Sequence, residues 1–416
     1  MARTVLKFGG TSVADLDRIA HVADIVAYRA ARGEHMAVIV SAMAGQTNKL
    51  VDLAQGAAGE ELAAEAFADE YDVIVASGEQ VTSGLLALAL RRRGLQARSW
   101  LGWQMRMNTR EGHGAARIEG FDQDSGLGEA IDRGEVAVIA GFQGVTQTGR
   151  VTTLGRGGSD TTAVAVAAAL GSVPCDIYTD VDGVYTTDPR IVPQAKRLER
   201  VSYEEMLEMA SLGAKVLQTR SVELAMNHQV PLRVLSSFSA PEAANPGTWI
   251  CNEDEIVEKQ VVNGVTYSRD EAKITLFGMT DKPGTSSRLF AQLAGIGVNV
   301  DMIVQANARG AGQANMVFTC TSADSAKAER LLTSARDDIG FESLEVTRDV
   351  AKVSVVGVGM KSHTGVAETM FEALAARNIN IDVISTSEIK ISVLIDADYT
   401  ELAVRALHTA FELDDS

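Results

Sequence analysis

The chain has 416 residues, of which 46% are hydrophobic, and a formal net charge of −17 at pH 7. A chain of this length and composition buries a sizeable core and is expected to form two or three domains. The acidic balance excludes a protein that works mainly on nucleic acid or an anionic membrane, because both are bound through basic surfaces.

The N-terminal residues lead directly into a strand, and no apolar run approaches the roughly 20 residues that span a bilayer. The three cysteines, Cys175, Cys251 and Cys320, lie far apart and include no Cys-x-x-Cys pair. They indicate neither a disulfide framework nor a zinc site, which fits a reducing compartment. We therefore expect a cytoplasmic protein without a membrane partner.

Up to about residue 245, short β-branched segments alternate with longer segments rich in Ala, Leu and Glu. This alternation is typical of βα units around a mostly parallel sheet. The predicted strands are 5–8, 36–40, 136–140 and 176–179, and the predicted helices are 15–32, 60–77, 81–94 and 161–170. Ser159 or Asp160 is the predicted N-cap of the last helix.

Residues 240–258 contain Pro241, Pro246, Gly247 and an acidic cluster, which break this rhythm. We therefore predict a first domain over 1–245 and a linker over 246–265.

An internal repeat follows the linker. The sequence Ala-Lys-Ile-Thr-Leu at 272–276 matches Ala-Lys-Val-Ser-Val at 351–355, and the Asn-x-Asp at 299–301 matches that at 380–382. In both halves a glycine, Gly284 or Gly365, precedes the asparagine by 15 positions. The repeat predicts two small α/β domains, 266–344 and 345–416, between which strands can be exchanged.

Several nucleotide-binding signatures are missing. The chain has no Gly-Lys dipeptide, which excludes the P-loop pattern, and no complete Gly-x-Gly-x-x-Gly. His-Arg-Asp and Asp-Phe-Gly, which mark protein kinases, are also absent.

Two glycine-rich segments carry the strongest chemical signal. Lys7 ends a predicted strand and precedes Gly9 and Gly10, so a point charge lies beside exposed amides where a phosphoryl group can sit. In the second segment, Gly155-Arg156-Gly157-Gly158-Ser159-Asp160, the arginine can bind a carboxylate with two hydrogen bonds, and the following amides open a helix. Together they suit phosphoryl transfer between two anionic substrates.

The string Lys-Phe-Gly-Gly-Thr-Ser-Val at 7–13 resembles the aspartate kinases of the amino-acid kinase family, and the segment 153–163 is a second, more specific match. A third string, 178–190, resembles the nucleoside site of that family. The resemblance implies a three-layer αβα kinase fold with a mostly parallel sheet. By the same resemblance, the C-terminal repeat is similar to two ferredoxin-like ACT domains, which sense amino acids.

The resemblance also implies roles for individual residues. Those expected to bind ATP are Lys7, Phe8, Gly9, Gly10, Thr179, Asp180, Tyr185, Arg190 and Lys215. Those expected to be catalytic are Lys7, Asp160 and Lys215, with Asp160 orienting Lys7. Those expected to bind the amino-acid substrate are Ser41, Thr47, Glu79, Arg156, Gly157, Gly158 and Ser159. The expected effector residues are Asp281, Asn299, Val300, Asp301, Gln305, Asn380, Ile381, Ser387 and Glu388.

The resulting prediction is ATP-dependent phosphorylation of the L-aspartate side chain to 4-phospho-L-aspartate, the first step toward lysine, threonine and methionine. Mg²⁺ is expected mainly on the nucleotide phosphates, and lysine, threonine or both are the expected inhibitors. Paired ACT domains predict at least a homodimer. The alternatives are another amino-acid kinase acting on glutamate, acetylglutamate or a nucleotide, and a non-catalytic amino-acid sensor. The ACT pair can also serve only for dimerisation.

Overall fold

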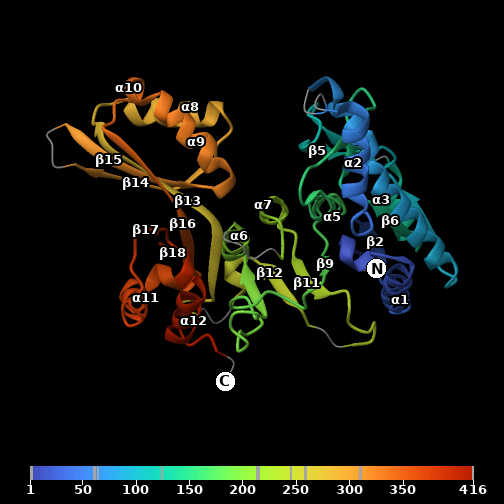
Figure 1. The fold of residues 1–416 in the computed structure, drawn as a ribbon. Coiled ribbons are helices and arrows are strands. Elements are labelled where there is room, and N and C mark those ends of the chain that lie inside the picture. The colour runs from blue at the N-terminus through green and yellow to red at the C-terminus, as the bar shows by residue number, and fades with distance from the viewer. Residues whose placement is uncertain are drawn as a thin grey trace. The chain divides into compact units, whose positions relative to one another are not determined.

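A computed structural model describes residues 3–59, 62, 65–122, 125–211, 216–243, 246–256, 260–308 and 312–414 (Figure 1). These residues form two compact units. The first contains the described residues within 1–184, 197–210 and 215–257, and the second those within 185–196, 211–214 and 258–416. The segment 185–196 therefore belongs with the C-terminal part of the chain rather than with its sequence neighbours.

An eight-stranded sheet forms the centre of the first unit, in the order β10-β12-β11-β9-β1-β2-β6-β3. Its strands are β1 (Arg3–Phe8), β2 (His35–Val40), β3 (Ala97–Trp100), β6 (Val136–Ala140), β9 (Cys175–Thr179), β10 (Arg200–Ser202), β11 (Leu232–Ser236) and β12 (Thr248–Cys251). All neighbouring pairs are parallel except β11 with β12. The predicted mostly parallel sheet is thus confirmed, and β1 lies near its middle.

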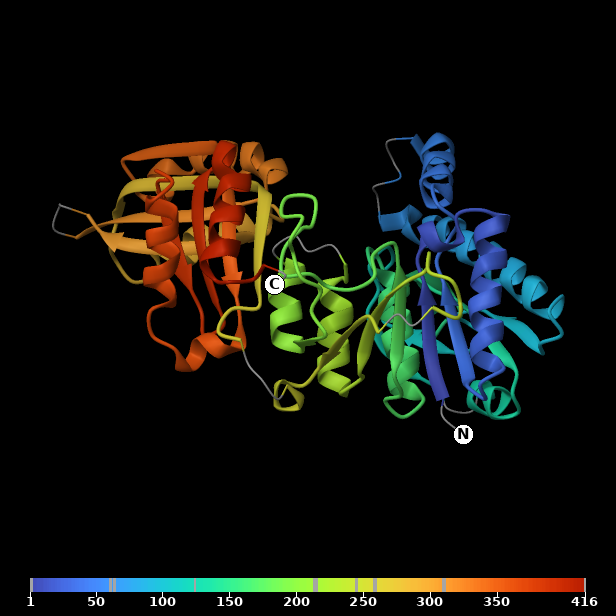
Figure 2. The same ribbon diagram turned by 90° about the horizontal axis from the view of Figure 1, so that it is seen from below.

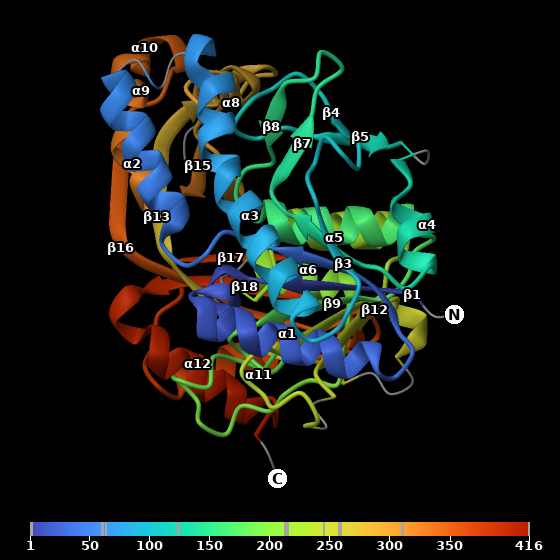
Figure 3. The same cartoon turned by 90° about the vertical axis from the view of Figure 1, so that its right-hand side faces the viewer.

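Helices cover both faces of this sheet. They are α1 (Leu16–Ala30), α2 (Gln46–Ala58), α3 (Ala68–Arg91), α4 (Leu127–Asp132), α5 (Gly158–Ala169), α6 (Tyr203–Ser211) and α7 (Thr219–His228), and the short helices η1 (Gly10–Val13), η3 (Glu65–Phe67) and η5 (Glu253–Glu255) join them. Successive β1 residues point to opposite faces. Phe8 packs into the core with α1, whereas Lys7 points to α5, so these helices lie on opposite faces (Figure 3).

A separate four-stranded sheet, β5-β4-β7-β8, belongs to the same unit. Its strands are β4 (Met107–Thr109), β5 (Ile118–Phe121), β7 (Gln143–Val145) and β8 (Val151–Thr153). Strand β8 leads directly into the turn that carries Arg156.

The sequence analysis predicts two helices, 60–77 and 81–94, with a break between them. That break was wrong, because the single helix α3 runs without interruption through Ser77 and Gly78. The glycine has a packing role there. A Cβ atom on Gly78 would lie 2.8 Å from the Ala42 Cβ, so only glycine allows α3 to approach the segment after β2 this closely. The N-cap prediction was also wrong, since Gly157 caps α5 with φ +71° and both Ser159 and Asp160 lie in the first turn.

Helix α3 is also long and apolar enough, by length and composition alone, to cross a membrane, which the sequence analysis did not predict. Half of its most apolar stretch is buried inside the protein, and the helix buries two carboxylates, Asp72 and Glu79. These features are typical of a core helix.

The predicted linker 246–265 differs from the structure in part. Thr248–Cys251 forms β12, which pairs with both β10 and β11 and extends the main sheet. Strand β13 then begins at Gly264. The surrounding prolines and acidic residues indicate a loop, and a strand of only four residues is too short to show an alternating pattern in the sequence.

The second unit contains a six-stranded sheet in the order β14-β15-β13-β16-β18-β17 (Figure 2). Its elements are β13 (Gly264–Thr280), α8 (Thr285–Gly295), β14 (Val300–Asn307), β15 (Gln313–Cys320), α9 (Ser322–Ser334), α10 (Arg336–Ile339), β16 (Ser343–Val356), η6 (Val358–Ser362), α11 (Val366–Ala375), β17 (Val383–Thr386), β18 (Lys390–Asp396), η7 (Ala397–Tyr399) and α12 (Thr400–Ala410). The edge strands β14 and β17 lie beside each other.

The structure confirms the internal repeat. Each half has a strand, a glycine turn, a helix and a second strand, and both Gly284 and Gly365 cap their helices with φ +95°. The two halves share the long strands β13 and β16, which pair with each other over most of their length. The predicted division between 344 and 345 falls inside β16.

Candidate active site

A cavity of about 360 Å³ lies in the first unit, where several strands of the parallel sheet end. Ligands commonly bind at this edge of an α/β sheet, because the loops there converge. The predicted residues that line it are Lys7, Gly10, Ser41, Thr47, Glu79, Arg156, Gly157, Gly158, Ser159 and Asp160. The structure therefore brings together the lysine motif, the glycine-rich arginine motif and two segments far from both in sequence.

Lys7 and Asp160 form an ion pair in this cavity, with Nζ 2.5 Å from Oδ1. Only about a tenth of each side chain is exposed. A buried charge pair costs desolvation energy that its attraction only partly returns, so it is weak evidence of a stabilising role. It does fix the ammonium group at the end of β1.

The backbone next to Lys7 is closely packed. A Cβ atom on Gly10 would lie 3.0 Å from the Ala42 carbonyl oxygen, and the Ser41 N–H donates to the Phe8 carbonyl at 3.1 Å. The turn after β1 and the turn after β2 are thereby joined. The Phe8 side chain, in contrast, is fully buried and stacks on Tyr178 with ring centroids 4.6 Å apart, so only its backbone faces this edge.

Arg156 lies in the turn before α5, with an exposed side chain. Behind it, a Cβ atom on Gly157 would lie 2.2 Å from the Gln218 Cγ, and one on Gly158 would lie 2.6 Å from the Phe142 ring. Only glycine fits at both positions, which brings the backbone amides of the α5 N-terminus to the cavity. A cation and a helix N-terminus together favour an anionic group.

Glu79 is buried on α3, and its Oε1 accepts a hydrogen bond from the Ala42 N–H at 3.0 Å. Its Oε2 is buried without a hydrogen-bond partner among the residues that the structure describes. Burial raises the pKa of Glu79 to about 7, although the bond from Ala42 opposes this. A carboxylate buried in this way suits a cationic partner that arrives with a ligand.

The pKa of Glu79 predicts a pH dependence for the binding of a substrate ammonium group. The carboxylate ionises as the pH rises through about 7, so kcat/KM for an amino-acid substrate is expected to fall by up to about tenfold per pH unit below 7. The pH profile of kcat/KM measures this. Glu79→Gln should flatten the profile, whereas Glu129→Gln, at an 82% exposed side chain, should keep it. An unchanged profile in Glu79→Gln contradicts the assignment.

The residues predicted to hold the nucleoside are not gathered in this cavity. Thr179 ends β9 and donates to Asp180 at 3.1 Å, in the first unit. Tyr185 and Arg190 belong to the second unit, where Tyr185 packs against the hydrophobic core and Arg190 pairs with Asp188. Lys215 lies outside the described residues. The roles of these residues stay predictions.

Sequence reasoning missed Asn48 and Phe142, which also line the cavity. Phe142 follows β6 with φ +69°, which is rare for a bulky residue and marks a constrained position. Its place after a buried parallel strand could have identified it. Asn48 directly follows the predicted substrate residue Thr47 and carries no separate signal.

The predicted effector residues lie along the edge strands of the second unit and the turns beside them. Asp301 on β14 forms an ion pair with Lys352 on β16 at 2.7 Å, and Asp382 pairs with Lys273 on β13 at 2.5 Å. Each half of the repeat thus provides the acid for the lysine of the other. The Lys352 bond lowers the pKa of Asp301 against the opposing effect of burial.

The other predicted effector residues lie on or next to β14, in the turn before α8 and on either side of β17. Gln305 on β14 accepts a hydrogen bond from Ser286 in the first turn of α8 at 3.2 Å. The Asp281 N–H donates to the Gly312 carbonyl, and the Ser387 N–H donates to the Lys390 carbonyl. The remaining predicted residues, Asn299, Val300, Asn380, Ile381 and Glu388, lie at the start of β14 and on either side of β17.

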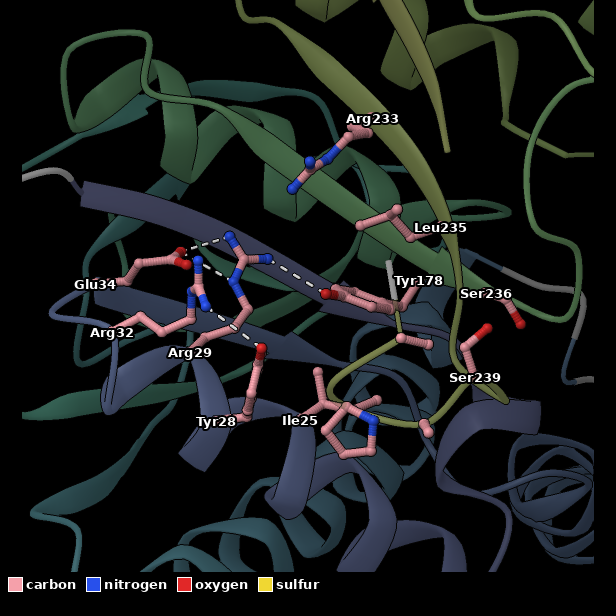
Figure 4. A pocket seen from close by; sticks show the side chains of 13 residues that line it. Ile25, Tyr28, Arg29, Arg32, Glu34, Tyr178, Arg233, Leu235, Ser236 and Ser239 are labelled. Atoms are coloured by element: carbon pink, nitrogen blue, oxygen red, sulfur yellow. Dashed lines mark hydrogen bonds and ion pairs between the residues drawn. The ribbon is translucent and has the colours of Figure 1, made fainter. Parts of the chain in front are cut away.

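A second cavity, of about 180 Å³, lies in the first unit beside α1 (Figure 4). It is lined by three arginines: Arg29 and Arg233 pair with carboxylates, and Arg32 donates to the Tyr28 hydroxyl at 3.4 Å. Arg29 bonds Glu34 and the fully buried Asp176, and Arg233 bonds the same Asp176 at 2.7 Å. These carboxylates keep the pKa of Arg29 raised although burial lowers it. Two of its three arginines are therefore already paired within the protein.

Comparison with known proteins agrees with this architecture. The amino acid kinase family matches residues 2–236, and the ACT domain matches 274–335 and 353–411. The chain belongs to the amino acid kinase family and carries ACT domains after its kinase domain. Within that family, its likeness over the whole length places it among the aspartate kinases, which are phosphotransferases.

Two curated relatives illustrate the likeness. The chain is 51% identical to the aspartate kinase of Pseudomonas fluorescens (strain SBW25) over 415 residues, covering 100% of this chain and 98% of the relative. It is 45% identical to the aspartokinase of Mycolicibacterium smegmatis over 418 residues, covering 99% and 97%. Among solved structures, E. coli aspartokinase III in complex with aspartate and ADP matches with a TM-score of 0.78, 29% identity, and coverage of 98% of this chain and 99% of that chain.

Proposed function

We propose that this aspartate kinase uses ATP to phosphorylate the side-chain carboxylate of L-aspartate, giving 4-phospho-L-aspartate. The observation that carries the proposal is the charge of the first cavity. Its charged lining residues are Lys7, Arg156, Glu79 and Asp160. Because Lys7 is paired with Asp160, Arg156 and Glu79 are left to receive a carboxylate and an ammonium group, which are the two charges of an α-amino acid.

The proposed acceptor needs no general base. An aspartate side chain, with a usual pKa near 3.9, is already ionised at neutral pH. The barrier is the approach of one anion to another, so the ammonium of Lys7 and the amides near Gly10 and at the α5 N-terminus would stabilise the developing charge. The complex of E. coli aspartokinase III with aspartate and ADP supports both substrates by analogy.

Mg²⁺ is proposed as part of the nucleotide complex. The described residues contain no group of three or more His, Cys, Asp or Glu side chains that could hold a metal ion. A Mg²⁺ ion held mainly by the phosphate oxygens of its nucleotide is a common arrangement. When bound there, the ion supplies charge neutralisation for phosphoryl transfer.

Formation of the acyl phosphate tests this proposal. The full chain would be incubated with ATP, Mg²⁺ and L-aspartate, and the product trapped with hydroxylamine. Turnover with aspartate, and none with glutamate or acetylglutamate, supports the proposal. Turnover only with another acceptor favours a different amino-acid kinase, and amino-acid binding without any turnover favours the sensor.

We further propose that lysine, threonine or both inhibit the enzyme through the ACT domains. The support is the position of the predicted effector residues, several of which lie on the edge strand β14 or directly before and after the neighbouring edge strand β17. A structure of E. coli aspartokinase III in complex with lysine and aspartate, termed the T-state, gives a precedent. A homodimer or larger oligomer and a cytoplasmic location complete the proposal.

Replacing Asn380 by alanine is expected to weaken amino-acid inhibition at least about tenfold, because a polar contact to a charged effector is lost. Calorimetric titration with lysine and threonine, singly and together, and the inhibition constants of each variant measure this. Asn227→Ala, an exposed position on α7 in the first unit, should behave as the wild type. If the wild type binds neither amino acid at millimolar concentration, the effector proposal fails.

A further inference from the structure

Asp72 on α3 is a fully buried carboxylate outside the cavity. It accepts hydrogen bonds from two segments that are distant in sequence. His113 Nδ1 lies 2.8 Å away, and the Gly114 N–H lies 3.1 Å from both oxygens. The Thr153 N–H lies 2.9 Å from Oδ2, and the Thr153 Oγ1 donates to Oδ1 at 2.5 Å.

Both segments lead to the arginine turn. Thr153 is the last residue of β8, three positions before Arg156. The Ala116 N–H donates to the Thr153 carbonyl at 2.8 Å, and a Cβ atom on Gly155, which has φ +74°, would lie 3.2 Å from the Gly114 carbonyl oxygen. The two segments therefore run together, and Asp72 holds both of them at the start of the turn.

Arg220 on α7 makes hydrogen bonds to both of these segments. Its guanidinium donates to the Leu154 carbonyl at 2.6 Å and to the Ala116 carbonyl at 2.7 Å. The backbone between Thr153 and Gly155 is thus fixed by a carboxylate that receives its N–H and a guanidinium that binds its carbonyl. Such support determines how precisely a substrate-binding side chain is held.

A carboxylate is the side chain that this position requires. The Gly114 N–H, the Thr153 N–H and the Thr153 hydroxyl all donate to Asp72. A carboxylate can accept such bonds with both oxygens, whereas an amide of the same size accepts with only one. The hydrogen bonds of Asp72 therefore indicate that it holds the two segments in a fixed geometry and does not serve to fill the hydrophobic core.

We propose that Asp72 is a positioning residue for substrate recognition: through His113, Gly114 and Thr153 it fixes the turn from which Arg156 binds the substrate carboxylate. The proposal rests on the proposed function for the role of Arg156. It assigns Asp72 no contact with the substrate.

Asp72→Asn keeps the size of the side chain but turns an NH₂ group toward the donors. The KM for aspartate is expected to rise about tenfold or more, and the KM for ATP to stay within about twofold, because the nucleotide does not depend on Arg156. In an Arg156→Ala background the same change should raise the aspartate KM by less than about twofold, since residues that act through one another are not additive. Thr153→Val removes one donor and should raise the KM by a smaller factor.

Glu205→Gln is the matched control. Glu205 on α6 is also fully buried in the first unit, where it accepts hydrogen bonds from the N–H and Oγ of Ser202 at 3.1 Å, and it does not line the cavity. This variant should keep the aspartate KM within about twofold of the wild type. An equal rise in Glu205→Gln, or an undiminished effect of Asp72→Asn beside Arg156→Ala, overturns the proposal in favour of a general stability effect.

Hydrogen–deuterium exchange separates this proposal from the proposed function. In Asp72→Asn, the amides of Gly114 and Thr153 should exchange at least about tenfold faster than in the wild type, whether or not aspartate is phosphorylated. Where Asp72→Asn does not fold, the same comparison is made with Thr153→Val for the amide of Gly114. A wild type inactive toward aspartate refutes the proposed function, whereas unchanged exchange refutes the role of Asp72.

Discussion

The Lys7→Ala variant is expected to lose activity by about 10²- to 10³-fold in kcat, while the aspartate KM changes by less than about threefold. The reason is that the Lys7 ammonium group is held at the end of β1 by Asp160, beside amides that can bind a phosphoryl group. Under the proposed function it acts on the charge that develops during transfer and not on the bound amino acid. Steady-state kinetics with varied aspartate and varied ATP measure the two effects.

Removing Lys7 also leaves Asp160 buried without its cation, which lowers stability. The double variant Lys7→Ala with Asp160→Ala removes that charge, so it should regain stability in thermal unfolding without regaining kcat. Lys327→Ala, at an exposed position on α9, should retain full turnover and stability. Full turnover in Lys7→Ala would remove Lys7 from the mechanism.

Arg156→Ala is expected to have the second largest effect, a rise of about 10²-fold in the aspartate KM with kcat changed by less than about fivefold. A hydrogen-bonded charge pair that is lost in a binding site typically costs about 2–5 kcal/mol. The loss falls on KM because the α-carboxylate is bound equally in the ground state and the transition state. Arg156→Lys should recover only part of the affinity, since an ammonium group cannot bind a carboxylate with two parallel bonds.

The control for this variant is Arg133→Ala, at a 66% exposed side chain after α4 in the first unit. It should leave both kinetic constants unchanged. The KM for ATP serves as an internal reference and should stay constant in Arg156→Ala. An unchanged aspartate KM would mean that another group binds the carboxylate.

Part of the cavity could be predicted from sequence because its residues lie at the ends of strands of one parallel sheet. Lys7 lies at the end of β1 and Ser41 directly follows β2, whereas the arginine motif follows β8 of the separate four-stranded sheet and precedes α5. The carboxyl ends of parallel strands meet at one edge, so residues there come together without knowledge of the packing. Family resemblance supplied Glu79, which has no signal of its own on a helix.

Asp72 could not be predicted in this way. It lies in a polar stretch near the start of α3 and resembles a solvated residue, while its partners His113 and Thr153 are 41 and 81 positions away. The same limit explains the wrong break in α3, since Gly78 indicates a turn until its contact with Ala42 is known. Contacts of this range depend on packing that local periodicity does not encode.

The matched motifs identify the repeat in the sequence, but they do not show which of its lysines pairs with which of its aspartates. The sequence predicts that Lys273 and Lys352 are equivalent, as are Asp301 and Asp382, without indicating which lysine meets which acid. The structure pairs each lysine with the acid of the opposite half. That choice depends on the edge strands β14 and β17 meeting.

These crossed ion pairs have a consequence for recombining regulatory modules between related enzymes. A hybrid that takes only one half of the repeat from a donor combines a lysine from one parent with an acid from the other, and its junction cuts the shared strand β16. Lys352, with a side chain only 6% exposed, also pairs with Glu271 of the first half at 2.8 Å, so in such a hybrid both of its acids come from the other parent. The two halves are therefore expected to work best when they are transferred together as a single cassette.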